Sequence, residues 1–202
     1  MNLDEVVAAR RSVRAFVDKP VPRDAVERAI RLSVQAPAPH HSAPWRFALI
    51  SDLDGKTELS RAMASAWKTD LEHDGHRPEK IEDILARSHR LLTGAPLLVI
   101  CCADMARAHD YPDRRRERAE WSLFAHSVGA ALQTFMLALT EDGIASCWIS
   151  APVFCGDTVQ RVLDLPQHVE PEALVLVGYP APDYVPRPRP EPNADDYVVA
   201  DW

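Results

Sequence analysis

The stretch APAPHHSAPWRF, which spans residues 36–47, decides how this chain is organised. Its first half alternates Ala and Pro, and a third proline follows at Pro44. Each proline removes a backbone hydrogen-bond donor and disfavours the helical conformation for the residue before it, so a helix has to end where the stretch begins. The stretch ends in aromatic and apolar residues that suit extended backbone. It is therefore predicted to join a helix to a strand.

The segments on either side of this stretch fit that interpretation. Before it, apolar residues recur at near-helical spacing from Ala25 to Gln35, which predicts a helix with one buried face. Asp24 belongs to the residue types favoured at an N-cap and is expected to begin that helix. After the last proline, Trp45 to Ser51 is predicted to be a strand.

The same periodicities apply along the rest of the chain. Continuous apolar runs of strand length are typical of strands that are buried on both faces. Further helices are predicted over Leu3 to Arg10, Gly55 to about Asp70, Glu79 to Leu92, Ala119 to Leu139 and Asp157 to Leu163, and further strands over Leu97 to Ala103, Ile144 to Ile149 and Leu174 to Gly178.

Two segments point to a homodimer. Ala119 to Leu139 is apolar around nearly its whole circumference, so it must be buried, most easily with part of it against another subunit. Residues 180–202 begin with a proline-rich run that has no helical or strand period, and the apolar, β-prone residues Tyr197, Val198, Val199 and Trp202 follow. This segment is expected to be an extended arm that docks on a partner subunit.

Length and composition limit the class of protein. A chain of 202 residues with 47% apolar and 26% charged residues suits one domain over residues 1–202. The net charge of −7 argues against a general nucleic-acid binder. Apolar runs such as Ala95 to Ala103 are too short to span a bilayer, and the N-terminus has no signal-peptide pattern, so no membrane association and a cytoplasmic location are expected.

Cysteine and histidine spacing gives no metal motif. The eight histidines are scattered except for His40-His41, and no two share one helix face at ligand spacing, so no metal is assigned. Trp45, Trp121 and Trp148 are expected in the core, because large aromatic side chains dominate core burial. The four cysteines lie in or beside apolar segments without the paired spacing of a zinc site and are expected to be buried free thiols: Cys101, Cys102, Cys147 and Cys155.

The basic run Arg10-Arg11-Ser12-Val13-Arg14 follows the first predicted helix in this acidic chain. Guanidinium groups offer forked donors that match phosphate oxygens, and the serine hydroxyl adds another hydrogen bond, so the run suits a phosphomonoester. Such a run can also be a solvated turn that pairs with surface carboxylates. The run alone does not decide between these interpretations.

Together, the motifs resemble those of the FMN-dependent nitroreductase family. The basic run, one helix and the proline-rich loop ending in PWRF match the opening of that family, and APAPHH narrows the similarity to the C-terminal flavin domain of coenzyme F420:L-glutamate ligase. The resemblance covers nearly the whole chain. It implies an α+β fold with a central, mostly antiparallel sheet flanked by helices, in a domain-swapped homodimer with FMN at the subunit interface. Three later stretches continue it: Trp67-Lys68-Thr69-Asp70, Ser146-Cys147-Trp148-Ile149 and Gly178-Tyr179.

The resemblance also implies roles for particular residues. Asp70, His40 and His41 would face the substrate, although Asp70 could instead cap the break at His73 to Gly75, and the two histidines could serve only loop structure. Ser150 would meet the flavin ring through its backbone, although the ligase domain looks to carry Gly there. The residues implied to hold FMN are Arg10, Arg11, Ser12, Val13, Arg14, Ala38, Ser150 and Arg187.

Three functions remain open at this point. The resemblance favours an FMN-dependent reductase of a dehydro precursor of coenzyme F420, and because Met1 lies just before the basic run, reduction without glutamylation is expected. The fold alone favours a general nitro or quinone reductase that uses NAD(P)H. The third alternative is a non-catalytic flavin- or deazaflavin-binding subunit that serves a separate ligase. Flavin carries hydride chemistry itself, so the absence of a catalytic triad or carboxylate pair fits this class.

Overall fold

Strand β2 (Leu97–Asp104) is the axis of the fold, because its apolar run is buried on both faces. In the computed structural model, which describes residues 1–200, it pairs with β1 (Trp45–Ile50) on one side and β4 (Val169–Gly178) on the other. The fourth strand, β3 (Ala145–Ile149), pairs with the far edge of β4. Within the described residues the order is β1-β2-β4-β3, and each neighbouring pair is antiparallel.

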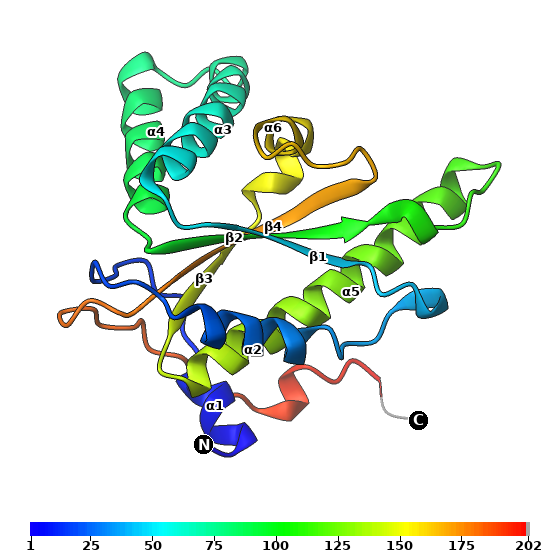
Figure 1. Cartoon of the computed structure of the whole chain (residues 1–202), viewed down its shortest axis with the longest axis horizontal. Helices are drawn as coiled ribbons and strands as arrows, with labels where there is room; N and C mark the ends of the chain where they lie inside the picture. Colours follow the sequence, from blue (N-terminus) through cyan, green and yellow to red (C-terminus); the bar gives the residue numbers. More distant parts are fainter. Residues whose placement is uncertain (201–202) are drawn as a thin grey trace.

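Helices cover both faces of this sheet (Figure 1). On one face lie α2 (Arg23–Ser33) and α5 (Arg114–Glu141), with the short α1 (Leu3–Ala9) against α5. On the other lie α3 (Leu53–His73), α4 (Pro78–Thr93) and α6 (Gly156–Val162). The chain is thus an α+β protein with an antiparallel sheet between two helical layers, as expected. Short 3₁₀ turns add η1 (Pro39–His41), η2 (Met105–Arg107), η3 (Ala151–Phe154) and η4 (Ala194–Asp196).

Alternation along β2 divides the apolar interior into two clusters. Cys101 packs with Phe124 and Phe135 of α5. Its neighbour Cys102 packs in the other cluster, with Leu59 of α3. Successive side chains of a strand point to opposite faces, so adjacent residues serve different layers. Cys101, Cys102 and Cys147 are buried free thiols as predicted, and Cys155 is half-buried.

A β-bulge explains why the sequence under-predicted β4. Cys101 pairs with Ala173 but Cys102 with Pro171, which leaves Glu172 as the extra residue on β4. The expected strand began only at Leu174 because two glutamates and a proline interrupt the apolar run ahead of it. β4 in fact begins at Val169.

Two predicted helix starts were wrong. Pro22 is the N-cap of α2, and Asp24 lies inside the first turn, where its carboxylate favours the helix dipole without capping it. α5 begins at Arg114 rather than Ala119, because the Asp113 side chain caps the helix by accepting from the Arg116 amide. The run Arg114-Arg115-Arg116 therefore forms the first turn of this helix.

Helix α5 is also less completely buried than its sequence predicts. Phe124, Phe135 and Leu139 are fully buried, but Trp121 and Leu123 are exposed by 41% and 43%. By length and composition α5 could cross a membrane, which corrects the expectation that no apolar run is long enough. Half of its most apolar window is buried inside the fold, so packing against the sheet accounts for that composition.

The predictions for Trp45, for Trp148 and for the C-terminal arm have different outcomes. Trp45 packs at the edge of the α2–α5 core and donates its Nε1 hydrogen to the Ser127 carbonyl over 2.9 Å. Trp148 is 38% exposed, so it is not a core residue of this chain. Residues 180–200 form no strand apart from one isolated bridge at Pro180, and Tyr197 to Val199 are exposed and irregular rather than β. The predicted role of Trp202 lies outside the described residues.

Candidate functional site

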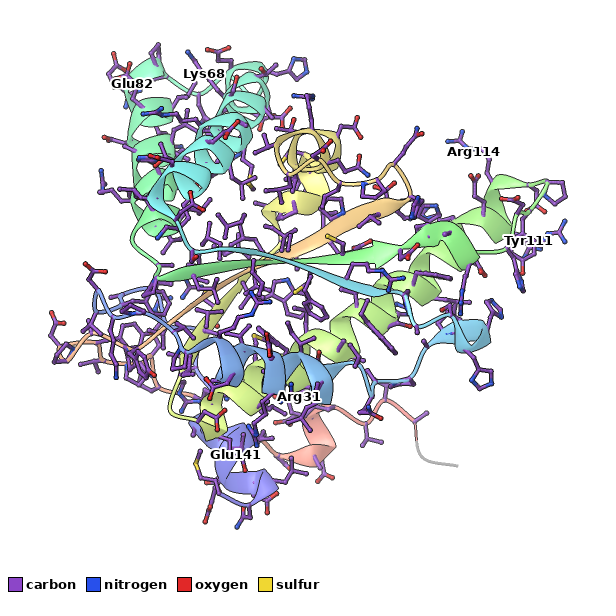
Figure 2. All side chains as sticks on the ribbon, viewed as in Figure 1. Arg31, Lys68, Glu82, Tyr111, Arg114 and Glu141 are labelled. Atoms are coloured by element: carbon purple, nitrogen blue, oxygen red, sulfur yellow. The ribbon has the colours of Figure 1, made fainter. Side chains whose placement is uncertain are left out.

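A cavity of about 830 Å³ lies between the α3–α4 hairpin, η3 and the sheet. The hairpin carries polar side chains such as Lys68 and Glu82 outward, away from the sheet (Figure 2). Its inner side is mainly apolar, with two carboxylates and two guanidinium groups at the walls. The residues of the lining that matter most below are Arg14, Met63, Trp67, Asp70, Phe154 and Cys155.

The basic run is fixed beside this cavity by strand β3. Ser12 forms an isolated parallel bridge with Ser146, and the Val13 amide donates to the Ser146 carbonyl over 3.0 Å. Val13 is buried, whereas Arg14 is exposed and contributes to the cavity lining. The basic run therefore presents Arg14 to the cavity.

The guanidinium groups of this run lack anionic partners. Within residues 1–200, no salt bridge joins Arg10, Arg11 or Arg14 to a carboxylate. The Nη1 atom of Arg11 is buried without a hydrogen-bond partner. Burial, together with the positive charges of Arg189 and Arg11, lowers the pKa of Arg10, against a smaller opposing effect of Cys147. The alternative of a surface turn paired with carboxylates thus fails, and the cluster is suited to an anion.

The C-terminal arm reaches the same turn within one chain. The Tyr184 hydroxyl donates to the Ser12 carbonyl over 2.7 Å, and Arg189 donates to the Arg10 carbonyl over 2.8 Å. The sequence had singled out Arg187, which is exposed and for which no contact with the turn is found in the described chain. Arg189 is thus an arginine of the site that sequence reasoning missed, since two arginines alternate with prolines there.

The structure brings Asp70 and the surroundings of Ser150 to the cavity. Asp70 lines it, and Ile149 and Ala151, the neighbours of Ser150, do so too. α3 continues to His73, with Asp74 as its C-cap, so Asp70 is not the residue that ends the helix. Cys155 lines the same cavity, and burial, followed by the charge of Asp70, raises the pKa of its thiol. Arg14 and Asp70 therefore border one hollow, although 56 positions separate them in the sequence.

Ala38, His40 and His41 lie elsewhere in the chain. η1 packs against α5, and His40 Nε2 is 3.1 Å from the Glu120 carboxylate. Within the described residues none of the three contributes to the cavity lining. In a single chain, the residues predicted to hold flavin and substrate therefore fall into two separate places.

The cavity also has aromatic walls that the sequence did not single out as a site. Trp67 and Phe154 are exposed by 43% and 84%, and both line the cavity. Exposed aromatic rings beside an apolar hollow are suited to a planar ligand. In the sequence, the stretch Trp67-Lys68-Thr69-Asp70 carries only a family resemblance. Nothing in its local pattern distinguishes a residue that lines a cavity from one that lies in the core.

Comparison with known proteins identifies the family to which this fold belongs. The family model described as the nitroreductase family matches residues 7–179. The chain belongs to the nitroreductase family. The matched range includes the last residues of α1, the whole sheet and the residues that line the cavity. Family membership makes the protein an oxidoreductase.

Curated relatives of this nitroreductase-family chain have different names. An iodotyrosine deiodinase of Haliscomenobacter hydrossis is 27% identical over 188 residues, covering 85% of this chain and 76% of the relative. A Bacillus subtilis protein, YfhC, whose name proposes an NAD(P)H nitroreductase, is 26% identical over 180 residues, covering 88% and 84%. Iodotyrosine deiodinase 1 of Rattus norvegicus is 24% identical over 189 residues, and the match spans only 61% of that protein's length.

Solved structures agree on the fold. A BluB-like flavoprotein from Clostridium difficile superposes with a TM-score of 0.81, at 21% identity, over 100% of both chains. A nitroreductase-like protein from Bacillus cereus gives a TM-score of 0.75 at 18% identity, covering 100% of this chain and 96% of its own. At such identities the similarity establishes the nitroreductase-like fold alone.

Proposed function

We propose that this protein is an FMN-dependent oxidoreductase whose cofactor phosphate binds at Arg10, Arg11, Ser12 and Arg14. The observation that carries the proposal is the buried, unpartnered Nη1 of Arg11, in a basic turn for which no carboxylate partner is found among residues 1–200. A phosphate would supply the missing acceptor and the missing negative charge. The backbone of Val13 and Ser150, and the side chains of Ala38 and Arg187, are the further contacts proposed for FMN. Once bound, the flavin supplies the hydride chemistry.

The cavity beside the turn has the size and walls that a cofactor and a small substrate need. Its volume of about 830 Å³ lies in the usual range for ligand sites, roughly 300–1,000 Å³. Trp67 and Phe154 offer ring faces, and Asp70 can only accept hydrogen bonds when it is ionised. The chain's own part in the reaction is to bind, orient and shield the reacting rings.

A homodimer would complete this site. Trp121, Leu123 and Trp148 leave apolar surface uncovered on α5 and β3, and Ala38, His40 and His41 lie away from the cavity of their own chain. A second copy packed on α5 could cover Trp121, Leu123 and Trp148. It could also bring Ala38, His40 and His41 to its partner's cavity. We propose a single domain over residues 1–202 in a cytoplasmic dimer. Up to Arg189 the arm contacts the basic run of its own chain, so the proposed docking of the arm 180–202 on the partner concerns the part beyond Arg189.

The substrate we propose is a dehydro precursor of coenzyme F420, and the relation to the flavin domain of its ligase is part of that proposal. A deazaflavin is a planar tricycle with hydroxyl-bearing and phosphate-bearing tails, which suits aromatic walls and the acceptor Asp70. The second candidate is an NAD(P)H-dependent nitro or quinone reductase, favoured by the name of the Bacillus subtilis relative. An accessory flavin-binding subunit is the third and would show no turnover.

The phosphate site is tested by comparing FMN with riboflavin, which lacks the phosphate. Arg10→Ala combined with Arg14→Ala should weaken FMN binding by orders of magnitude, since each charge-assisted bond contributes about 1.5–3 kcal/mol. Riboflavin binding should change little. Arg31→Ala, on the exposed side of α2, is the matched control and should bind FMN as the wild type does. Equal loss of FMN and riboflavin would show that the turn does not bind the phosphate.

The substrate is tested by calorimetric titration with coenzyme F420. The wild type should bind it, and Asp70→Ala should lose that binding while keeping FMN and its reduction by dithionite. Asp74→Ala is a control one turn further along α3, also at the cavity. No heat at high micromolar coenzyme, combined with steady NADH-dependent reduction of a nitro compound, would replace the first candidate by the second.

A further inference from the structure

Three side chains from distant parts of the sequence meet near the N-terminal end of α5. His40 comes from η1, His109 from the loop after η2, and Glu120 from the second turn of α5. The Nε2 atom of His40 lies 3.1 Å from one Glu120 oxygen and 3.4 Å from the other. The His109 ring stacks on the His40 ring with a centroid distance of 4.0 Å. One nitrogen from each ring and a carboxylate oxygen all lie within 4.8 Å of one another.

Glu120 is an anion held almost out of water. Its exposed fraction is 3%, and the backbone amide of His109 donates to it over 2.9 Å. A carboxylate this buried needs a positive charge or a metal ion beside it.

The second imidazole is not needed to neutralise this carboxylate. Within residues 1–200 the ring of His109 makes no hydrogen bond, because its contact with Glu120 runs through the backbone amide. The ion pair between His40 and Glu120 does not use this ring, which stacks on His40 and meets the Tyr111 ring edge-on. Its position beside the pair, with a nitrogen in reach of the same point in space, is that of a third ligand.

Two of the three ligand atoms already have the spacing found around a four-coordinate metal ion. Zn²⁺ binds imidazole nitrogen and carboxylate oxygen at about 2.0–2.2 Å, so neighbouring ligand atoms of a tetrahedral site lie roughly 3.3–3.5 Å apart. The pair formed by His40 and Glu120 already has nearly that separation, and an inward turn of the exposed His109 ring would close the set. Two imidazoles and one carboxylate are donors that suit Zn²⁺ or a similar divalent transition metal rather than Mg²⁺ or Ca²⁺.

We propose that His40, His109 and Glu120 bind one divalent ion of the Zn²⁺ type, with water at the remaining position. The site lies at the end of the molecule where Tyr111 and Arg114 project, far from the α3–α4 hairpin (Figure 2). The ion fastens η1, and with it the loop that carries Ala38, to the first turns of α5. His40 is then a metal ligand, and of the two neighbouring histidines only His41 stays free to face a substrate.

Metal uptake by the purified flavoprotein tests this proposal. After treatment with a chelator, the protein is dialysed to equilibrium against Zn²⁺, and bound zinc is measured by atomic emission. The wild type should bind one ion per chain, and His109→Ala should bind at least ten times more weakly. His73→Ala, which removes an exposed histidine of α3, is the matched control and should bind as the wild type does.

Two further measurements distinguish a specific metal site from nonspecific binding of metal ions to histidines. Co²⁺ should give the intense visible bands of a four-coordinate ion in the wild type and in His73→Ala, but not in His109→Ala. Glu120→Gln should also lose the bands, and because Glu120 is buried, its fold is checked by circular dichroism. If Glu120→Gln unfolds, His109→Ala still tests the proposal, because His109 is exposed and its replacement should leave the fold intact. Zinc uptake by His109→Ala equal to that of the wild type, or no uptake by the wild type, would overturn the proposal.

Discussion

The two faces of the sheet are covered to different degrees. On the α2–α5 face, Phe124, Phe135 and Leu139 fill a continuous core and have no exposed surface. On the α3–α4 face, the core under Leu59 gives way to a cavity of about 830 Å³. Both layers rest on the same four strands, so the strands themselves do not cause the difference.

The cause lies in how the helices meet the sheet. α5 is one rod of 28 residues that approaches β1, β2 and β3 along its length. α3 and α4 instead pack mainly against each other, and α3 also against α6, so the hairpin stands over the sheet without closing on it (Figure 1). One face therefore provides stability and the other provides a binding site, and substitutions on the two faces should differ accordingly.

The largest expected effect is on the closed face. Phe135→Ala removes a fully buried ring from the α2–α5 core and should lower the free energy of unfolding by about 3–5 kcal/mol. Urea denaturation followed by circular dichroism measures it. A loss below about 1 kcal/mol would mean that this layer is loosely packed and collapses around the gap.

The second prediction uses a thiol of the open face. Cys155 borders the cavity, whereas the other three cysteines are buried, so an alkylating reagent should modify Cys155 alone in the native protein. The reaction should be slow at neutral pH, because burial and the charge of Asp70 raise the pKa of this thiol. A ligand in the cavity should slow it further. Mass spectrometry locates the label, and Cys155→Ser should abolish it; modification of Cys101 at a similar rate would contradict the division between the faces.

A smaller effect is expected from the cavity wall. Trp67→Ala removes a side chain as large as a core aromatic, but Trp67 is 43% exposed. Its loss should change the free energy of unfolding by about 1 kcal/mol or less. The urea experiment used for Phe135→Ala allows direct comparison. Equal losses for the two variants would show that the open face stabilises the fold as much as the closed one.

The smallest effect concerns the bulge on β4. Burial, followed by the charge of Glu170, raises the pKa of Glu172 in the folded state. The folded state therefore holds this proton to higher pH than the unfolded chain does, so the stability it contributes is lost as pH rises through the folded pKa. Glu172→Gln should raise the free energy of unfolding slightly at pH 7.

This gain should shrink as the pH falls below the unfolded pKa of about 4.3, where the carboxyl is protonated in both states. Urea titrations of Glu172→Gln and the wild type at pH 7 and near pH 4 measure the difference. Asp196→Asn, in the exposed η4 turn, is a control whose stability should vary less with pH. A variant that is less stable at pH 7 would show that Glu172 binds a partner in solution.

The fold was largely predictable because local signals mark its boundaries. Prolines end α2, the glycine at Gly143 adopts a φ of +73° after α5, and uninterrupted apolar runs mark β1 and β2. The misses share one cause, which is charge inside a regular element. The helix predicted from Ala119 left out the arginines in the first turn of α5, although Arg is a good helix former, and the glutamates of β4 concealed a strand that tolerates them at a bulge.

The candidate site was less predictable, because it depends on distances across the fold. The basic run and Asp70 were found through a resemblance, and the structure places Arg14 and Asp70 at one cavity. Trp67 and Phe154 were missed as wall residues because an apolar side chain has the same pattern in a wall as in a core. The cluster of His40, His109 and Glu120 was missed because metal motifs in sequences rely on short spacing, and here 69 and 11 positions separate the members.

The neighbouring thiols of Cys101 and Cys102 give the molecule two internal reporters only one peptide bond apart. One packs in the cluster under α2 and α5 and the other in the cluster on the face that carries α3, α4 and α6, so each becomes reachable when its own face opens. Local openings in a protein differ in free energy from one cooperative unit to the next. Pulsed thiol labelling in mild denaturant would therefore give the order in which the two layers separate, with the same strand, the same reagent and the same experiment serving both.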